Sequence, residues 1–191
     1  MKKIGLTGGI GVGKTYVAEV FEELGFPVFN ADDKAKECLV KNQELINLVK
    51  KNFGDKIYKD DVLQKESLAT LVFNDSVALS KLNSLVHPVV KKEFFYWCKK
   101  QEAKFIIKEA AILFESKSNV DLDSIICVSA PEEVRIKRIL KRDSTTLNEI
   151  KKRMSFQISQ KEKEDLSDYI IYNDEQQLIL PQILQFIKQM E

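Results

Sequence analysis

Near its amino terminus the chain reads Gly8-Gly9-Ile10-Gly11-Val12-Gly13-Lys14-Thr15. These residues fit the pattern G-x-x-x-x-G-K-[ST], the signature of a phosphate-binding loop. Backbone that wraps closely around a phosphate needs positive φ angles and no Cβ atoms, and both requirements favour glycine. The N–H groups of such a loop form an anion nest, and the following helix presents its positive end to the phosphates. The stretch therefore predicts a nucleotide-binding loop rather than a glycine-rich turn that binds nothing.

The residues around the loop supply the setting that this motif requires. Ile4, Leu6 and Thr7 indicate a short buried strand before the loop. Apolar residues at helical spacing follow the loop, and Gly25 ends the predicted helix. Within the loop, Lys14 offers a positive charge to the β- and γ-phosphates, and Thr15 offers a hydroxyl ligand to Mg²⁺.

The bulk properties of the chain exclude several classes of protein. A length of 191 residues suits one domain, and 44% hydrophobic with 31% charged residues is ordinary for a soluble globular protein. A net charge of +1 gives no global field that would attract nucleic acid or a membrane. The three cysteines are far apart and lack a C-x-x-C pattern, which indicates free thiols in a reducing compartment. With no signal-peptide pattern and no apolar run of ~18 residues, we expect a cytoplasmic protein.

Short apolar runs alternate with helical periodicity along the chain. Beyond the first strand, further strands are expected at 26–30, 105–107, 125–128 and 169–172, and helical stretches at 33–52, 64–101, 131–142 and 176–190. Phe53-Gly54 and a polar stretch to Asp61 separate the two middle helical stretches. Because short apolar runs fit strands buried on both faces, the alternation predicts a five-stranded parallel sheet between helices. The long helical block before the third strand predicts an inserted subdomain that covers a substrate.

Two acidic positions follow predicted strands, where the ligand crevice of an open α/β sheet lies. Asp32 is suited to accept the proton of a hydroxyl that attacks the γ-phosphate, or to help order Mg²⁺. Its alternative role is helix capping, with Asp33 a second candidate for the cap. Glu109 follows the strand at 105–107, the position of a carboxylate that holds Mg²⁺ in phosphate-loop proteins. For Glu109, and for Glu115 further along, the competing interpretation is surface charge.

The arginines after the fourth predicted strand allow two interpretations. Their guanidinium groups suit phosphate recognition. The lysines between them fit the alternative, a basic helix exposed to solvent. The arginines are Arg135, Arg138, Arg142 and Arg153. His87, the only histidine, has no partners at metal-ligand spacing and is expected to make local hydrogen bonds.

Together with the loop, several later blocks of the chain resemble the dephospho-coenzyme A kinase family. They are Asn30-Ala31-Asp32, Leu85-Val86-His87-Pro88, Ile112-Leu113-Phe114-Glu115, Ser129-Ala130-Pro131 with Arg135 and Arg138, Arg142-Asp143, Arg153 with Gln157, and Asp168-Tyr169-Ile170-Ile171 with Asn173. The resemblance runs from Ile4 to about Asn173, and the order of the blocks is more specific than the loop alone. It implies ATP-dependent phosphorylation of the 3′-hydroxyl of dephospho-CoA to give CoA and ADP, the last step of coenzyme A biosynthesis.

The resemblance also implies roles for single residues. The segment that binds the ATP phosphates is expected to comprise Gly11, Val12, Gly13, Lys14, Thr15 and Tyr16. Catalysis is expected from Asp32 as proton acceptor, Lys14 as phosphate ligand and Arg142 as lid arginine. Thr15 and Glu109 are the expected Mg²⁺ ligands. Asn30 departs from the family pattern, which has Asp there, and an amide forms hydrogen bonds but adds no charge.

For the fold, the resemblance implies one kinase domain over 1–191, a three-layer α/β/α core of the P-loop kinase type. The core is expected at about 1–32, 104–141 and 168–191, a helical CoA-binding insertion at about 33–103, and a lid at about 142–167. Another small-molecule kinase with this core, acting on a nucleoside or nucleotide, is the alternative function. A GTP-dependent switch is disfavoured, because the chain contains neither N-K-x-D nor D-x-x-G.

Overall fold

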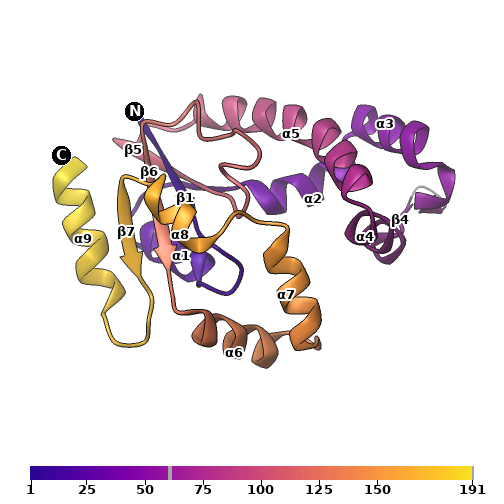
Figure 1. Ribbon diagram of the computed structural model, residues 1–191. Helices are drawn as coiled ribbons and strands as arrows, with labels where there is room; N and C mark the ends of the chain where they lie inside the picture. Colours follow the sequence, from indigo (N-terminus) through magenta and orange to yellow (C-terminus); the bar gives the residue numbers. More distant parts are fainter. Residues whose placement is uncertain (60–61, 191) are drawn as a thin grey trace. The chain divides into compact units, whose positions relative to one another are not determined.

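The computed structural model describes residues 1–59 and 62–190 (Figure 1). Residues 60 and 61, the end of the polar stretch after Phe53-Gly54, lie outside the described residues. Contacts divide the chain into two compact units. We call Met1–Asn30 with Gln101–Glu191 the sheet unit, and Ala31–Lys100 the helical unit.

Five parallel strands in the order β2-β5-β1-β6-β7 form the centre of the sheet unit. Their bounds are β1 Lys2–Thr7, β2 Val28–Asn30, β5 Phe105–Glu109, β6 Ser124–Ser129 and β7 Tyr169–Tyr172. The central strand β1 places Leu6 opposite Glu109 of β5 and Thr7 opposite Cys127 of β6. The predicted five-stranded parallel sheet is confirmed. Because all strands run the same way, the phosphate loop after β1 and Glu109 at the end of β5 share one edge.

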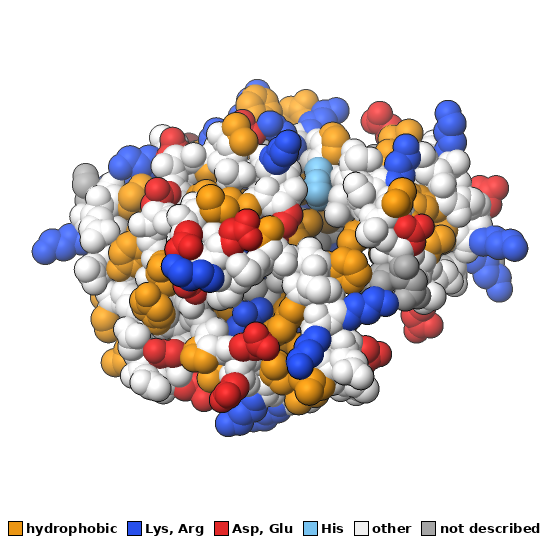
Figure 2. Space-filling model, in the orientation of Figure 1, with side chains coloured by type: hydrophobic (Ala, Val, Ile, Leu, Met, Phe, Trp, Pro, Cys, Tyr) orange, Lys and Arg blue, Asp and Glu red, His pale blue; other side chains and the backbone are white. Residues whose placement is uncertain are grey.

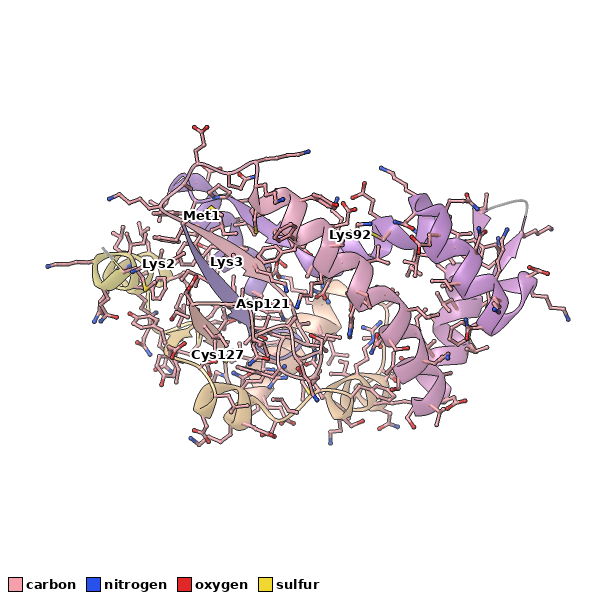
Figure 3. All side chains as sticks on the ribbon, turned by 90° about the horizontal axis from the view of Figure 1, so that it is seen from above. Met1, Lys2, Lys3, Lys92, Asp121 and Cys127 are labelled. Carbon is pink, nitrogen blue, oxygen red and sulfur yellow. The ribbon has the colours of Figure 1, made fainter. Side chains whose placement is uncertain are left out.

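The helices of the sheet unit are α1 Lys14–Glu23, α6 Glu132–Arg142, α7 Leu147–Ser155, α8 Gln160–Asp165 and α9 Ile179–Met190. On one face of the sheet, α1 and α9 bury Phe21 and Phe186 with ring centroids 6.2 Å apart. Burying such a side chain contributes about 1.5–3 kcal/mol. Helix α8 packs on β6, and Lys2, labelled in Figure 3, joins β1 to the end of α9 by donating to the carbonyl of Met190 (3.0 Å).

The helical unit contains α2 Ala31–Lys41, α3 Gln43–Phe53, η1 Asp55–Ile57, β3 Tyr58–Lys59, β4 Val62–Leu63, α4 Lys65–Asn74 and α5 Ser76–Cys98. Each of the helical stretches predicted at 33–52 and 64–101 is formed by two helices. Both breaks fall on capping residues: Asn42 accepts a hydrogen bond from the N–H of Leu45, and Asp75 from the N–H of Val77. Side chains of Asn and Asp favour a helix start, which interrupts the apolar periodicity. The antiparallel pair β3 and β4 was not predicted.

Charges of both signs are interspersed over the face of the molecule drawn in Figure 2. This distribution agrees with the net charge of +1. Within residues 1–59 and 62–190, no helix combines the length and the apolar character needed to cross a membrane.

Candidate active site

The phosphate loop joins β1 to α1 and is packed tightly on its outer side. Gly11 and Gly13 have φ angles of 83° and 87°, in the left-handed region that favours glycine. A Cβ atom on Gly11 would lie 2.8 Å from the carbonyl oxygen of Arg135, and a Cβ atom on Gly13 would collide with the amide of Asn173. These glycines therefore allow α6 and the residue after β7 to approach the loop, as well as allowing the loop to wrap a phosphate.

Lys14 is the first residue of α1, and its ammonium group folds back over the start of the loop. Its Nζ donates to the carbonyl oxygens of Gly8 (3.0 Å) and Gly9 (3.3 Å). The N-cap of α1 is Gly13, which has no side chain to compete with an anion for the first N–H groups of the helix. The loop thus combines a helix N-terminus with a fixed positive charge, both of which favour phosphate.

Glu109 is buried at the end of β5, with 4% of its surface exposed, so it is not surface charge. Its Oε1 lies 3.3 Å from the hydroxyl oxygen of Thr15, which donates to it. Its Oε2 accepts a hydrogen bond from Nδ2 of Asn30 (2.8 Å). An aspartate at position 30 would set two carboxylates side by side, whereas the amide orients Glu109 and leaves one charge. The structure brings together the two residues expected to hold Mg²⁺.

Two arginines of α6 contact the loop through its carbonyl groups. Nε of Arg135 donates to the carbonyl of Ile10 (2.9 Å), and burial lowers the pKa of the Arg135 guanidinium. Nη1 of Arg138 donates to the carbonyl of Val12 (3.4 Å), and its Nη2 lies 3.3 Å from a carboxylate oxygen of Glu175. A solvated basic helix is therefore wrong for these two positions.

Two glutamines, one in α8 and one just before it, hold the first N–H groups of the loop. Oε1 of Gln157 accepts from the N–H of Ile10 (3.0 Å), and Oε1 of Gln160 accepts from the N–H of Gly9 (2.9 Å). Gln160 also donates to the carbonyl of Val128 (3.2 Å), which fixes it to β6. No role was predicted for Gln160, and Gln157 was predicted only as part of a block that resembles the family. About 150 residues separate each glutamine from its partner, so no local pattern points to these contacts.

A buried ion pair joins α8 to the segment that follows Glu109. Lys163 is fully buried, and its Nζ donates to Oε1 of Glu115 (2.7 Å) and to the carbonyl of Ala111 (2.8 Å). The same carboxylate oxygen accepts from the N–H of Ile158 (3.1 Å). Glu115 is thus a structural residue that holds the start of α8 in place, rather than surface charge.

Arg142 ends α6 and is held by its neighbour in the chain. Its Nε and Nη2 donate to the two carboxylate oxygens of Asp143 (2.8 and 3.1 Å), and 67% of its side-chain surface is exposed. Nη1 of Arg153 lies 3.1 Å from the same carboxylate. The hydrogen bond with Arg142 lowers the pKa of Asp143 and raises that of Arg142.

Asp32 lies in the first turn of α2, where the helix dipole favours a carboxylate. The helix begins at Ala31, so capping by Asp33 was the wrong expectation: Asp33 is exposed inside the first turn and pairs with Lys36 (2.7 Å). Tyr16, in the first turn of α1, has 55% of its surface exposed.

Cys127, labelled in Figure 3, lies buried on β6, and desolvation raises the pKa of its thiol to about 11. A thiol with this pKa stays protonated at neutral pH and is a poor nucleophile. Cys38 and Cys98 are likewise buried.

A parallel sheet, a glycine-rich loop leading into α1, and a buried acid beside the loop threonine define the class of P-loop kinases. Shikimate kinase from Acinetobacter baumannii shares this fold, with a TM-score of 0.55 and 16% identity over 100% of this chain and 92% of that chain. A likeness at this level supports the fold alone.

The particular family follows from the sequence comparisons. The family model described as dephospho-CoA kinase matches residues 2–178, and the chain belongs to that family. Dephospho-CoA kinase of Bacteroides fragilis strain YCH46 is 37% identical over 190 residues, which cover 97% of this chain and 91% of the relative. Dephospho-CoA kinase from Campylobacter jejuni has a TM-score of 0.69 with 27% identity, covering 100% and 98% of the two chains. The protein TT1252 from Thermus thermophilus reaches a TM-score of 0.87 with 27% identity, covering 98% and 96%.

Proposed function

We propose that this chain transfers the γ-phosphoryl group of ATP to the 3′-hydroxyl of dephospho-CoA, giving CoA and ADP. The observation that carries this proposal is the family match over residues 2–178. In the same chain, the phosphate loop leads through Gly13 into helix α1, as nucleotide binding requires. The contact between Thr15 and Glu109 supports the phosphoryl-transfer half, and family membership supports the acceptor. Buried free thiols fit a cytoplasmic enzyme.

The loop, with Lys14 and Tyr16 at the start of α1, binds the ATP phosphates in this proposal. Mg²⁺ fits beside it, because the hydroxyl of Thr15 and the carboxylate of Glu109 are hard oxygen ligands with 3.3 Å between the two atoms. When bound, this ion neutralises charge on the β- and γ-phosphate oxygens. Asn30 orients Glu109 for that role through its hydrogen bond.

Asp32 accepts the proton in the chemical step that we propose. The 3′-oxygen bonds to the γ-phosphorus, the bond from that phosphorus to the β,γ-bridging oxygen breaks, and the hydroxyl proton passes to the Asp32 carboxylate. ADP leaves with the bridging oxygen. Asp32 comes two residues after Asn30, the last residue of β2, and the carboxyl ends of parallel strands are where open α/β sheets bind their ligands.

The segment at about 142–167 contains the lid in this proposal. Its moving part lies before Gln157, because Gln157 and Gln160 are bonded to the loop and Lys163 to Glu115. Arg142 joins the phosphates when this part closes. Arg142 must then exchange its contact with Asp143 for a contact with phosphate oxygens, which an exposed guanidinium allows. Closure excludes water, so that transfer to the acceptor outcompetes hydrolysis of ATP. In this proposal the core spans about 1–32, 104–141 and 168–191, and the CoA-binding insertion about 33–103.

The test is an acceptor panel analysed by mass spectrometry. The purified protein is incubated with ATP, Mg²⁺ and one acceptor, chosen from dephospho-CoA, nucleosides, nucleotides and shikimate. Dephospho-CoA should gain one phosphoryl group at the 3′-position, and the other acceptors should remain unchanged. Phosphorylation of a nucleoside or nucleotide in preference to dephospho-CoA would overturn the proposal.

A further inference from the structure

The side chains behind the phosphate loop change from acceptors to donors along its length. Behind the first two peptide groups, Gln160 and Gln157 accept hydrogen bonds from N–H groups. Behind the later part of the loop, the contacts are made by donors: Arg135 donates to the carbonyl of Ile10, and Arg138 and Asn173 donate to the carbonyl of Val12.

This order matters because a trans peptide group directs its N–H and its C=O to opposite sides. The first part of the loop shows the consequence. With the N–H groups of Gly9 and Ile10 held by the glutamines, the carbonyls of the same peptide groups belong to Gly8 and Gly9. Those two carbonyls accept from Nζ of Lys14, at 3.0 and 3.3 Å. The acceptors behind the loop therefore turn its first carbonyls toward Lys14.

The same geometry gives the opposite result further along. The carbonyl of Ile10 shares a peptide group with the N–H of Gly11, and the carbonyl of Val12 shares one with the N–H of Gly13. Arg135 holds the first carbonyl at 2.9 Å, and Asn173 holds the second at 2.8 Å. Both carbonyls face outward, so both glycine N–H groups face into the loop, where a phosphate nest needs donors.

We propose that Arg135, Arg138 and Asn173 are positioning residues that fix the peptide groups before Gly11 and Gly13 with their N–H groups directed at the nucleotide phosphates. The three side chains act through the loop backbone and do not contact the nucleotide. This proposal rests on the proposed function only in requiring that the loop bind a nucleotide.

The burial and the partners of these residues favour positioning over direct phosphate binding. Arg135 is 7% exposed, and the space over Gly9 is filled by its guanidinium, since a Cβ there would collide with it. Arg138 divides its donors between Val12, Asn173 and Glu175. Asn173 is itself anchored, because its N–H donates to the carbonyl of Ser129 (2.7 Å).

Glycine-selective ¹⁵N labelling tests the proposal residue by residue, because the chain has seven glycines and gives seven amide signals. The variants are Arg135→Met, Arg138→Met and Asn173→Leu. The matched control is Lys137→Met, which removes an exposed charge from the same helix. In the free protein, Arg135→Met should shift or broaden the Gly11 signal, and the other two variants the Gly13 signal. The Gly25 and Gly54 signals should not move, and Lys137→Met should leave all seven in place.

Affinities for ATP and ADP provide the second readout. If the arginines position the loop, both affinities should fall by a similar factor, about tenfold, because a loop that must be reordered lowers apparent affinity for either nucleotide. The KM for dephospho-CoA should stay within about twofold. A selective loss of ATP affinity would assign the arginines to the γ-phosphate and overturn the proposal, as would Gly11 and Gly13 signals and affinities equal to those of the control.

The buried Arg135 is the variant at risk of misfolding, so Arg138→Met and Asn173→Leu are each sufficient to decide. Equal disturbance of all seven glycine signals by both of these variants would show a general structural role and contradict the proposal. Because the glycine signals and the nucleotide affinities are measured without dephospho-CoA, a wrong acceptor assignment would leave these two readouts unchanged. The two proposals therefore fail in distinguishable ways.

Discussion

The phosphate loop and Arg142, the arginine of the proposed lid, are the two sets of phosphate-binding residues proposed for this protein, and they are held in different ways. Loop residues are anchored by side chains far away in the sequence: Gln160 lies 151 positions from Gly9, and Asn173 lies 161 positions from Val12. Arg142 of the lid is held by the adjacent residue, Asp143, and is largely exposed. The loop is held by side chains from several distant segments of the sheet unit, whereas the contact of Arg142 is local.

This difference fits two different tasks. A nest that binds phosphate gains from being ordered before the nucleotide arrives, because no reorganisation is then needed during the reaction. An arginine that must reach the phosphates after binding needs a contact that exchanges easily. An exposed ion pair, worth about 0–1 kcal/mol, meets that need.

The largest loss of activity is expected from a substitution of Asp32, which lies outside both the loop and the lid. Asp32→Asn should slow single-turnover transfer to dephospho-CoA by ~10²–10⁴-fold, the usual contribution of a general base. The low end is favoured, because little proton has moved in a dissociative transition state. ATP affinity should change little.

The matched control is Asp33→Asn at the exposed neighbour, which should transfer at the wild-type rate. Loss of ATP affinity in Asp32→Asn would make Asp32 a metal or structural residue. Unchanged transfer would move the base elsewhere, with Glu109 the next candidate.

Within the loop, removing the charge of Lys14 should have the next largest effect. Lys14→Ala should lower kcat/KM by ~10²-fold or more in a folded protein, because a preorganised charge at the transition state contributes several kcal/mol. Steady-state kinetics with Lys188→Ala, an exposed lysine on α9, as control would measure it. Near wild-type turnover in a folded Lys14→Ala protein would remove the loop from the mechanism.

The anchor of α8 should matter for stability rather than for chemistry. Lys163→Met leaves Glu115 without its buried partner and should lower the free energy of unfolding by about 3 kcal/mol, whereas the double variant Glu115→Leu/Lys163→Met should recover much of the loss. Denaturant titration measures both. Lys161→Met, which breaks an exposed pair with Asp165, should cost less than about 1 kcal/mol. Equal losses for Lys161→Met and Lys163→Met would contradict the structural role assigned to the buried pair.

A smaller effect is expected from the lid arginine. Arg142→Met should lower kcat by about 10–100-fold, since a hydrogen bond to a charged group contributes about 1.5–3 kcal/mol. ATP affinity in the absence of dephospho-CoA should fall much less, because Arg142 is bonded to Asp143 in the structure without ligands. Lys141→Met, at the neighbouring exposed position, is the control. Equal kcat values for Arg142→Met and Lys141→Met would show that Arg142 has no role in phosphoryl transfer.

Local sequence patterns were sufficient for the sheet and for the loop. Short apolar runs located all five parallel strands, and the glycine spacing located the loop that joins β1 to α1. The proximity of Glu109 to Thr15 was predictable, because an acid at the end of a parallel strand lies at the same edge of the sheet as the loop.

The contacts behind the loop were not predictable from local patterns. Gln160 and Asn173 are polar residues whose partners are set by the packing of α8 and β7, and polar side chains leave no periodic signal. Arg135 was predicted to bind phosphate or to lie on a solvated basic helix. Its burial was not predictable, because its partner, the carbonyl of Ile10, lies 125 residues away in the chain. The helix breaks at Asn42 and Asp75 were missed because the apolar periodicity on either side outweighed a single capping residue.

Hydrogen exchange measured by mass spectrometry, in the free protein and with ADP and dephospho-CoA bound, tests the contrast between loop and lid most directly. The amides of Gly9 and Ile10, already held by glutamines, should exchange slowly in both states. Exchange across residues 142–157 should be slower in the complex than in the free protein, as the lid closes. Equal exchange across 142–157 in the two states would contradict a closing lid, and fast exchange of Gly9 and Ile10 in the free protein would contradict a loop ordered in advance.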